Sequence, residues 1–146
     1  MDNIFLQTMK LYAKGFCCSQ IIVMLAMEAE GKKNPDLVRS LGGLCFGVNW
    51  SGEVCGALSG GACLISLYSG KGSEGETQDN RCTTMIGDLV EWFTLAAHEE
   101  YGGTRCHEIL EKYPDRSMCG LIVSETYKKC MDILADHGLQ PACHKR

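Results

Sequence analysis

The sequence predicts an all-α fold, a compact single-domain bundle of about six to seven helices that spans residues 1–146. Three observations predict this class. Apolar residues recur at helical spacing in several segments. Glycine or proline separates these segments, as expected at helix ends. No segment has the apolar–polar alternation of a strand. A chain of 146 residues is long enough to bury a core of its own.

Seven segments are expected to be helical: residues 2–14, 17–30, 35–41, a helix with Cys55 in its first turn, 82–100, 104–110 and 118–136. In the first, apolar residues from Ile4 to Tyr12 lie near a 3.6-residue period and Gly15 ends the helix. The second is apolar nearly all round, which is typical of a helix buried on most sides. In the third, Asn34 and Pro35 form a helix-start signature of a capping side chain followed by proline.

The fourth helix contains an unusual number of glycines. A glycine-rich loop over residues 42–52 precedes it, and Gly56 and Gly60 fall on one of its faces. Each glycine inside a helix costs about 1 kcal/mol relative to alanine. The sequence therefore indicates that a backbone, a cluster or a ligand approaches this helix closely, because a helix without side-chain bulk permits such contact.

The remaining helices follow a polar, glycine-rich loop over residues 69–81. The helix over 82–100 is amphipathic and ends at Gly102. Thr104 is the expected N-cap of the next helix, and Ser117 of the last. The tail, Leu139–Arg146, contains Cys143 and His144 and is expected to be loosely held.

Composition excludes several classes of function. The net charge of −4 and the scattered lysines argue against a nucleic-acid partner, which requires a basic surface. The N-terminus lacks the basic and apolar regions of a secretory signal, and no apolar run is long enough to span a membrane. A cytoplasmic location is therefore expected.

Ten cysteines set this chain apart. In a chain without an export signal, such enrichment indicates metal binding or thiol chemistry. The four cysteines at expected helix starts are Cys18, Cys55, Cys106 and Cys119. Helix N-termini have unpaired amides and a positive dipole end, so we expect the pKa of these thiols to be lowered toward thiolate formation.

Three segments together resemble the C_GCAxxG_C_C family of redox-active proteins: Phe16-Cys17-Cys18-Ser19-Gln20, Gly52-Glu53-Val54-Cys55-Gly56-Ala57-Leu58-Ser59-Gly60, and Cys106 with Cys119. The resemblance covers nearly the whole chain. It implies a small cysteine-dependent redox protein that uses Cys18, Cys55, Cys106 and Cys119. Gly56, Ala57 and Gly60 are the candidate cofactor-binding positions. The family also resembles a cysteine-bearing segment of split-Soret cytochromes, which implies an iron–sulfur centre.

The residues leave three functions open. The four cysteines could cycle between dithiol and disulfide, as a thiol–disulfide oxidoreductase or electron carrier with a partner protein or small thiol. They could instead be ligands of an iron–sulfur cluster or zinc ion. In a scaffold or interaction protein, cysteines would only pack, and they would have no reason to recur at helix starts. A homo-oligomer is compatible with each of these functions.

The sequence contains six further cysteines. Cys17 could replace its neighbour Cys18, Cys45 lies in the glycine-rich loop, and Cys63 lies about two turns after Cys55. Cys82, Cys130 and Cys143 are interpreted as core or surface thiols. His107 is expected to lie on a helix surface rather than in a metal site. Glu53 is expected to cap the start of the helix that follows it.

Overall fold

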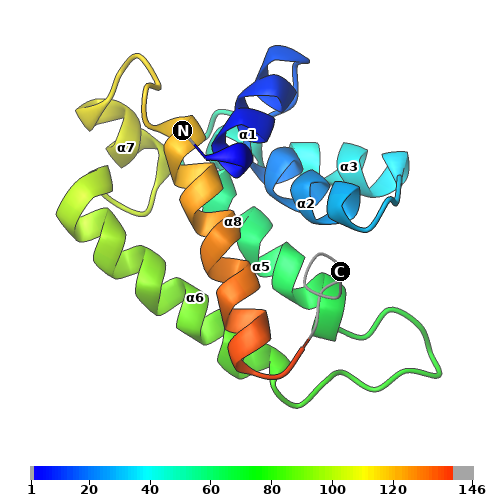
Figure 1. The fold of residues 1–146 in the computed structure, drawn as a ribbon. Coiled ribbons are helices and arrows are strands. Elements are labelled where there is room, and N and C mark those ends of the chain that lie inside the picture. The colour runs from blue at the N-terminus through cyan, green and yellow to red at the C-terminus, as the bar shows by residue number, and fades with distance from the viewer. Residues whose placement is uncertain (1, 140–146) are drawn as a thin grey trace.

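The computed structural model describes residues 2–139 and confirms the all-α fold (Figure 1). Within that range there is no strand, and the only β-type pairing is an isolated bridge between Val54 and Arg105. The α-helices are α1 (Asn3–Ala13), α2 (Cys18–Ala29), α3 (Pro35–Leu41), α4 (Cys45–Val48), α5 (Gly56–Ser69), α6 (Cys82–Ala96), α7 (Cys106–Lys112) and α8 (Cys119–Asp136). A 3₁₀ turn, Gly42–Leu44, precedes α4, and a π turn, Ala97–Tyr101, follows α6.

Helix α5 lies at the centre of the bundle, packed against α2, α6 and α8. Its apolar side chains and those of its neighbours form one buried core. The largest fully buried side chains include Ile21 and Ile22 of α2, Leu64 of α5, Phe93 of α6 and Leu134 of α8. Burying a side chain of this size contributes about 1.5–3 kcal/mol, so this core is the main source of stability for the arrangement.

The glycines of α5 allow α2 to approach it closely. A Cβ atom on Gly60 would lie 2.6 Å from Ile22 Cγ2 and 2.9 Å from Ser19 Cα. A Cβ atom on Gly56 would overlap Cys18 Sγ. The predicted close approach is therefore confirmed, and α2, with Cys18 at its first position, is the element that makes it.

The segment expected to be a loop over residues 42–52 has a more defined structure. After the 3₁₀ turn, residues 46–50 all have positive φ, from 52° at Asn49 to 68° at Trp50. This is a left-handed turn, in which Asn49 N–H donates to Cys45 O at 2.8 Å. Asparagine and glycine tolerate such a conformation, but phenylalanine, valine and tryptophan rarely adopt it. Sequence propensity therefore did not predict it.

Most predicted helix boundaries are close to those observed, but two caps differ. The N-cap of α7 is Arg105 rather than Thr104, and Glu108 Oε1 accepts a hydrogen bond from Arg105 N–H at 3.1 Å. The N-cap of α8 is Met118 rather than Ser117. Ser117 N–H donates instead to Asp115 Oδ1 at 3.0 Å, so Asp115 organises the turn before α8.

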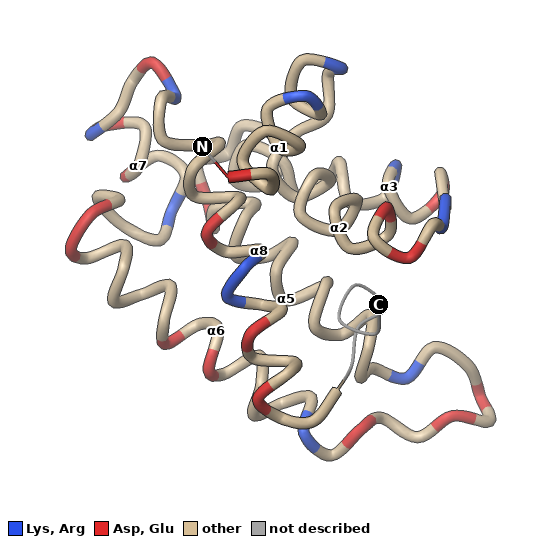
Figure 2. Tube along the Cα trace, viewed as in Figure 1, with Lys and Arg blue, Asp and Glu red and all other residues tan. Residues whose placement is uncertain are grey.

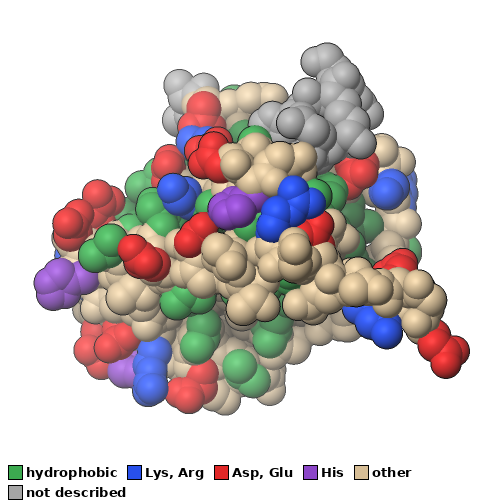
Figure 3. All heavy atoms as spheres, turned by 90° about the horizontal axis from the view of Figure 1, so that it is seen from below, with side chains coloured by type: hydrophobic (Ala, Val, Ile, Leu, Met, Phe, Trp, Pro, Cys, Tyr) green, Lys and Arg blue, Asp and Glu red, His purple; other side chains and the backbone are tan. Residues whose placement is uncertain are grey.

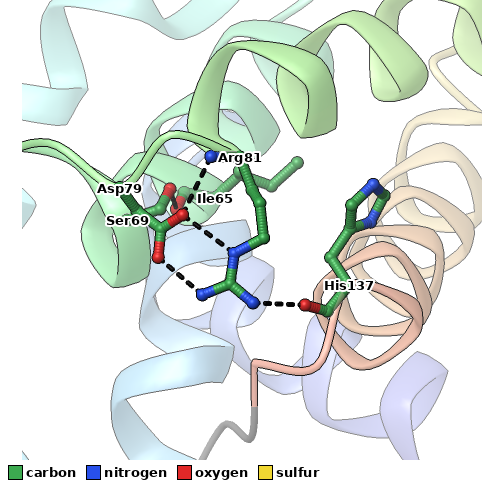
Figure 4. Close-up of polar contacts among 5 residues, drawn as sticks. All are labelled: Ile65, Ser69, Asp79, Arg81 and His137. Carbon is green, nitrogen blue, oxygen red and sulfur yellow. Dashed lines mark hydrogen bonds and ion pairs between the residues drawn. The ribbon is translucent and has the colours of Figure 1, made fainter.

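A polar network closes the bundle where α5 and α8 end and α6 begins (Figure 4). The carboxylate of Asp79 accepts two hydrogen bonds from the guanidinium of Arg81, at 2.9 and 2.7 Å. Arg81 also donates to the carbonyl oxygen of His137, at the C-terminal end of α8. Asp79 N–H donates to Ser69 O, the last residue of α5, at 2.8 Å. The network fixes the 70–81 loop to both helices.

Positive charge is not concentrated in one place on the surface that residues 2–139 form. Lysine and arginine are dispersed along the chain and interspersed with aspartate and glutamate (Figure 2). On the face seen in Figure 3, charged, histidine and apolar side chains are similarly mixed. None of the helices in the described residues is long and apolar enough to cross a membrane.

Candidate functional site

Cys18, Cys55, Cys106 and Cys119 all line one cavity of about 720 Å³. Cys18, Cys106 and Cys119 are the first residues of α2, α7 and α8, and Cys55 is the N-cap of α5. The predicted helix-start placement is therefore what the structure shows, and the fold brings the four residues to a common space. Gly56 and Ala57 line the same cavity, whereas Gly60 packs against α2.

Two short extended segments hold Cys55 and Cys106 side by side. Cys55 N–H donates to Thr104 O at 2.9 Å, and Cys106 N–H donates to Glu53 O at 2.7 Å. The Val54–Arg105 bridge lies between these two bonds. Glu53 does not cap α5, contrary to our expectation, since its carboxylate lies 3.8 Å from Arg105 Nη1 across the paired segments. The pairing fixes where α5 and α7 begin.

Backbone amides surround the sulfur of Cys18. The N–H groups of Phe46, Ser19 and Gly56, from the left-handed turn, α2 and α5 respectively, act to lower its pKa. The amides of Ala57 and Leu58 act in the same way on Cys55. Amide donors of this kind stabilise a thiolate over a thiol. The predicted lowering of the pKa of the four cysteines depends on such amide donors.

Burial outweighs these donors, so the predicted lowering of the pKa is wrong. Burial raises the pKa of Cys18, and it raises that of Cys55 well above the ordinary range. Burial, followed by the charges of Cys18 and Cys106, raises the pKa of Cys119 to about 11. Burial and Cys18 raise the pKa of Cys106. Arg116 acts in the opposite direction on Cys106 and Cys119. Without further positive charge, the four groups are thiols at neutral pH.

Two further cysteines line this cavity. Cys17, the N-cap of α2, and Cys45, the first residue of α4, are joined by a disulfide with a Cα–Cα distance of 5.9 Å. Both belong to the cavity wall. The sequence places Cys17 beside Cys18 and Cys45 in the glycine-rich loop, but it contains no signal for their pairing. Their separation of 28 residues depends on how α2 and α4 pack.

The other described cysteines lie outside the cavity lining. Cys130 is fully buried in α8, and its Sγ lies 3.6 Å from Gly61 O, as expected for a core thiol. Cys82 is also buried, although it is the first residue of α6. A helix-start position therefore does not by itself identify a cavity residue. Cys63 is partly buried against the core. Cys143 and His144 lie outside the described residues.

Aromatic and cationic side chains that the sequence analysis did not select complete the cavity wall. Phe46 and Trp50 stack with a centroid distance of 3.8 Å, and the guanidinium of Arg116 lies 4.6 and 4.5 Å from their centroids. Tyr12 is partly buried against the core, and its pKa is raised by desolvation and then by Cys18, Cys119 and Cys55. This phenol therefore stays neutral beside the thiols. Spacing in α1 indicated only that Tyr12 faces the core.

His107 points away from the cysteines. Its Nδ1 lies 3.7 Å from Glu111 Oε1 on the surface of α7, in agreement with the predicted surface position. Throughout residues 2–139, no three histidine, cysteine, aspartate or glutamate side chains are grouped closely enough to hold a single metal ion. The cavity thiols are thus spread around the space rather than gathered at one point.

These features define a class: an all-α, cysteine-rich protein in which thiols at helix starts line a common cavity. The chain belongs to the family described as "Putative redox-active protein (C_GCAxxG_C_C)", whose model matches residues 16–133. The match includes all four predicted site cysteines and the Cys17–Cys45 disulfide. No curated protein and no solved structure is similar enough to the chain to match it.

Proposed function

We propose that this protein is a redox protein whose active centre is an iron–sulfur cluster, bound by the thiolates of Cys18, Cys55, Cys106 and Cys119. The observation that supports this most strongly is their placement around one cavity of about 720 Å³, at the starts of four helices. Clusters of the [2Fe–2S] and [4Fe–4S] types are held by four cysteine thiolates. When bound, such a cluster would supply one-electron transfer.

The raised pKa values favour a cationic occupant. Four thiolates around one cavity, one buried and three partly buried, would repel one another, and Arg116 alone does not offset the loss of hydration. A metal centre would favour the thiolate form of each ligand. The absence of a close three-residue group among the described side chains favours a larger cluster over a single zinc ion, because the ligands of one zinc ion lie about 2.0–2.3 Å from it.

The surrounding residues have definite roles in this proposal. The amides near Cys18 and Cys55 would hydrogen-bond to ligand sulfurs, which is one of the ways in which proteins set a cluster's reduction potential. Gly56 leaves the space that Cys18 Sγ occupies. The neutral phenol of Tyr12 and the apolar lining would make the surroundings of the thiols less polar than water.

A second candidate function is thiol–disulfide exchange among the same four cysteines. The charge of Cys18 raises the pKa of each of the other three, so its sulfur lies in their midst. Cys18 is therefore the residue best placed to pair with any of them. The raised pKa values oppose this chemistry, because the thiolate is the nucleophile.

Anaerobic reconstitution with ferrous iron and sulfide tests the proposal. We expect absorption bands between about 300 and 500 nm and stoichiometric iron and sulfide. Serine substitution at Cys55 or Cys119 should remove most of the iron, whereas Cys63→Ser, in the same helix as the Cys55 cap, should retain it. Equal iron content in all variants would refute the cluster. A colourless protein that loses two or four thiols on mild oxidation would favour disulfide exchange instead.

A further inference from the structure

We propose that Cys17 and Cys45 form a second redox site, a dithiol–disulfide couple that a small thiol reduces from within the cavity. The two residues lie outside the four-cysteine motif, but their disulfide forms part of the same cavity wall. The couple is independent of the cluster proposed above, because it uses different sulfur atoms. It also differs from exchange among the four motif cysteines.

Each sulfur of this pair faces an acceptor that only the reduced form can use. Ser19 Oγ lies 3.1 Å from Cys45 Sγ, and its own hydroxyl hydrogen can be donated to Leu41 O at 2.8 Å. With that hydrogen engaged, the oxygen presents lone pairs to Cys45. A disulfide has no hydrogen to donate, whereas a thiol has one. Ser19 is therefore arranged to accept a hydrogen bond from reduced Cys45.

Gln20 provides the corresponding hydrogen-bond acceptor for reduced Cys17. Its side-chain oxygen lies 3.4 Å from Cys17 Sγ, and its amide nitrogen donates to Val38 O at 3.0 Å. That second bond orients the amide with its oxygen toward Cys17. The oxygen also accepts from Cys17 N–H at 3.1 Å, a bond present in both redox states. The dithiol form therefore leaves neither thiol without an acceptor.

The route to this pair runs through the cavity. Cys17 and Cys45 are 8% and 4% exposed, so their sulfurs do not lie on the outer surface. The cavity lining nevertheless includes Met9 and Trp50, which are 44% and 61% exposed. The cavity therefore reaches the surface near these two side chains. A small thiol that enters there meets the disulfide on the wall of a cavity of about 720 Å³, a space that cannot hold a folded protein partner.

The reaction balances as an ordinary exchange. A thiolate of the reductant attacks one sulfur of the pair, which breaks the Cys17–Cys45 bond and forms a mixed disulfide. The cysteine that leaves as thiolate takes up a proton. A second thiolate, from a second molecule of a monothiol such as glutathione or from the other end of a dithiol, then attacks the mixed disulfide and releases the other cysteine, which is also protonated. Two electrons and two protons pass to the pair, and the reductant leaves as its own disulfide.

Thiol trapping on the metal-free, folded protein tests this proposal. The protein is equilibrated in buffers of graded reduced-to-oxidised glutathione ratio, and separately in dithiothreitol, then alkylated and mapped by fragmentation mass spectrometry. We expect Cys17 and Cys45 to gain and lose labels together and reversibly as the glutathione ratio changes. A pair that opens only after denaturation would be structural, and labels in every buffer would show that no couple exists; either result overturns the proposal.

Two variants separate a redox site from a structural disulfide. Removing an acceptor should make the reduced form harder to reach, so Gln20→Met should raise the glutathione ratio at half-reduction about two- to tenfold, as expected for the loss of one hydrogen bond. Ser19→Ala should act in the same direction if it folds. An unchanged ratio in both variants would contradict the acceptor argument. The Cys17→Ser/Cys45→Ser double variant should still bind iron if the cluster proposal holds, so the two proposals can fail separately.

Discussion

Replacing Gly60 with alanine tests the close approach of α2 and α5 on which the site depends. The new Cβ would lie 2.6 Å from Ile22 Cγ2, 2.9 Å from Ser19 Cα and 3.0 Å from Ser19 O. Two of these three atoms belong to the backbone of α2, so they can move only if the helix moves. Overpacking of this kind costs about 1–3 kcal/mol. Alanine regains up to about 1 kcal/mol of helix propensity.

The expected net change for Gly60→Ala is therefore a loss of up to about 2 kcal/mol in the free energy of unfolding. Urea denaturation measures it directly. Gly87→Ala is the matched control, since Gly87 lies exposed within α6 and its Cβ would meet nothing within 4 Å. That variant should gain about 0.5–1 kcal/mol. The reasoning is refuted if Gly60→Ala is stabilised as much as Gly87→Ala, because the new Cβ would then meet no resistance from α2.

Three further predictions concern the thiols, the acid response and the left-handed turn. The pKa of Cys119 is raised to about 11, so in metal-free protein its alkylation at pH 7 should be roughly 100-fold or more slower than that of an ordinary thiol. The alkylation rate should rise with pH up to about 11. Rapid labelling of Cys119 at pH 7 would contradict this. Arg81 lowers the pKa of Asp79 to about 2, so the contribution of this ion pair to stability should be present above about pH 4 and lost as the pH falls toward 2. In denaturation measured at several pH values, Asp79→Asn should lose this part of the acid dependence. An unchanged acid profile in that variant would count against the ion pair. Gly47 has φ 64°, and a Cβ there would lie 2.6 Å from Glu53 O, so Gly47→Ala should lower the free energy of unfolding in urea by at least about 2 kcal/mol. Asn49→Gly, at φ 52°, should change it by less than about 1 kcal/mol. Equal effects of the two substitutions would be inconsistent with the turn.

The helices and the four helix-start cysteines were predictable because they depend on local signals. Apolar periodicity located α1, α2, α6 and α8, and proline or glycine located several of their ends. The motif around Cys55 then identified which thiols to consider together. Local signals were sufficient for these features because each depends on residues within a few turns of one another.

The disulfide, the pKa values of the thiols and the position of Arg116 depend on tertiary packing, which local sequence patterns do not predict. The pairing of Cys17 with Cys45 requires α2 and α4 to meet across 28 residues. The pKa values of the cavity thiols depend on how deeply they are buried, so a rule based on helix ends alone gave the wrong sign. Arg116 acts on the cavity only because it stacks on Phe46 and Trp50.

The left-handed turn over residues 46–50 determines which part of the native protein opens first. Three of its five residues, Phe46, Val48 and Trp50, are neither glycine nor asparagine, and each costs about 1–2 kcal/mol in this conformation. That sum is a large part of the whole stability of a typical domain, about 5–15 kcal/mol. Its amides should therefore exchange hydrogen with solvent before those of α5 and α8. Because Phe46 and Trp50 both line the cavity, brief unwinding of this turn would widen the access to the thiols without separating any two helices.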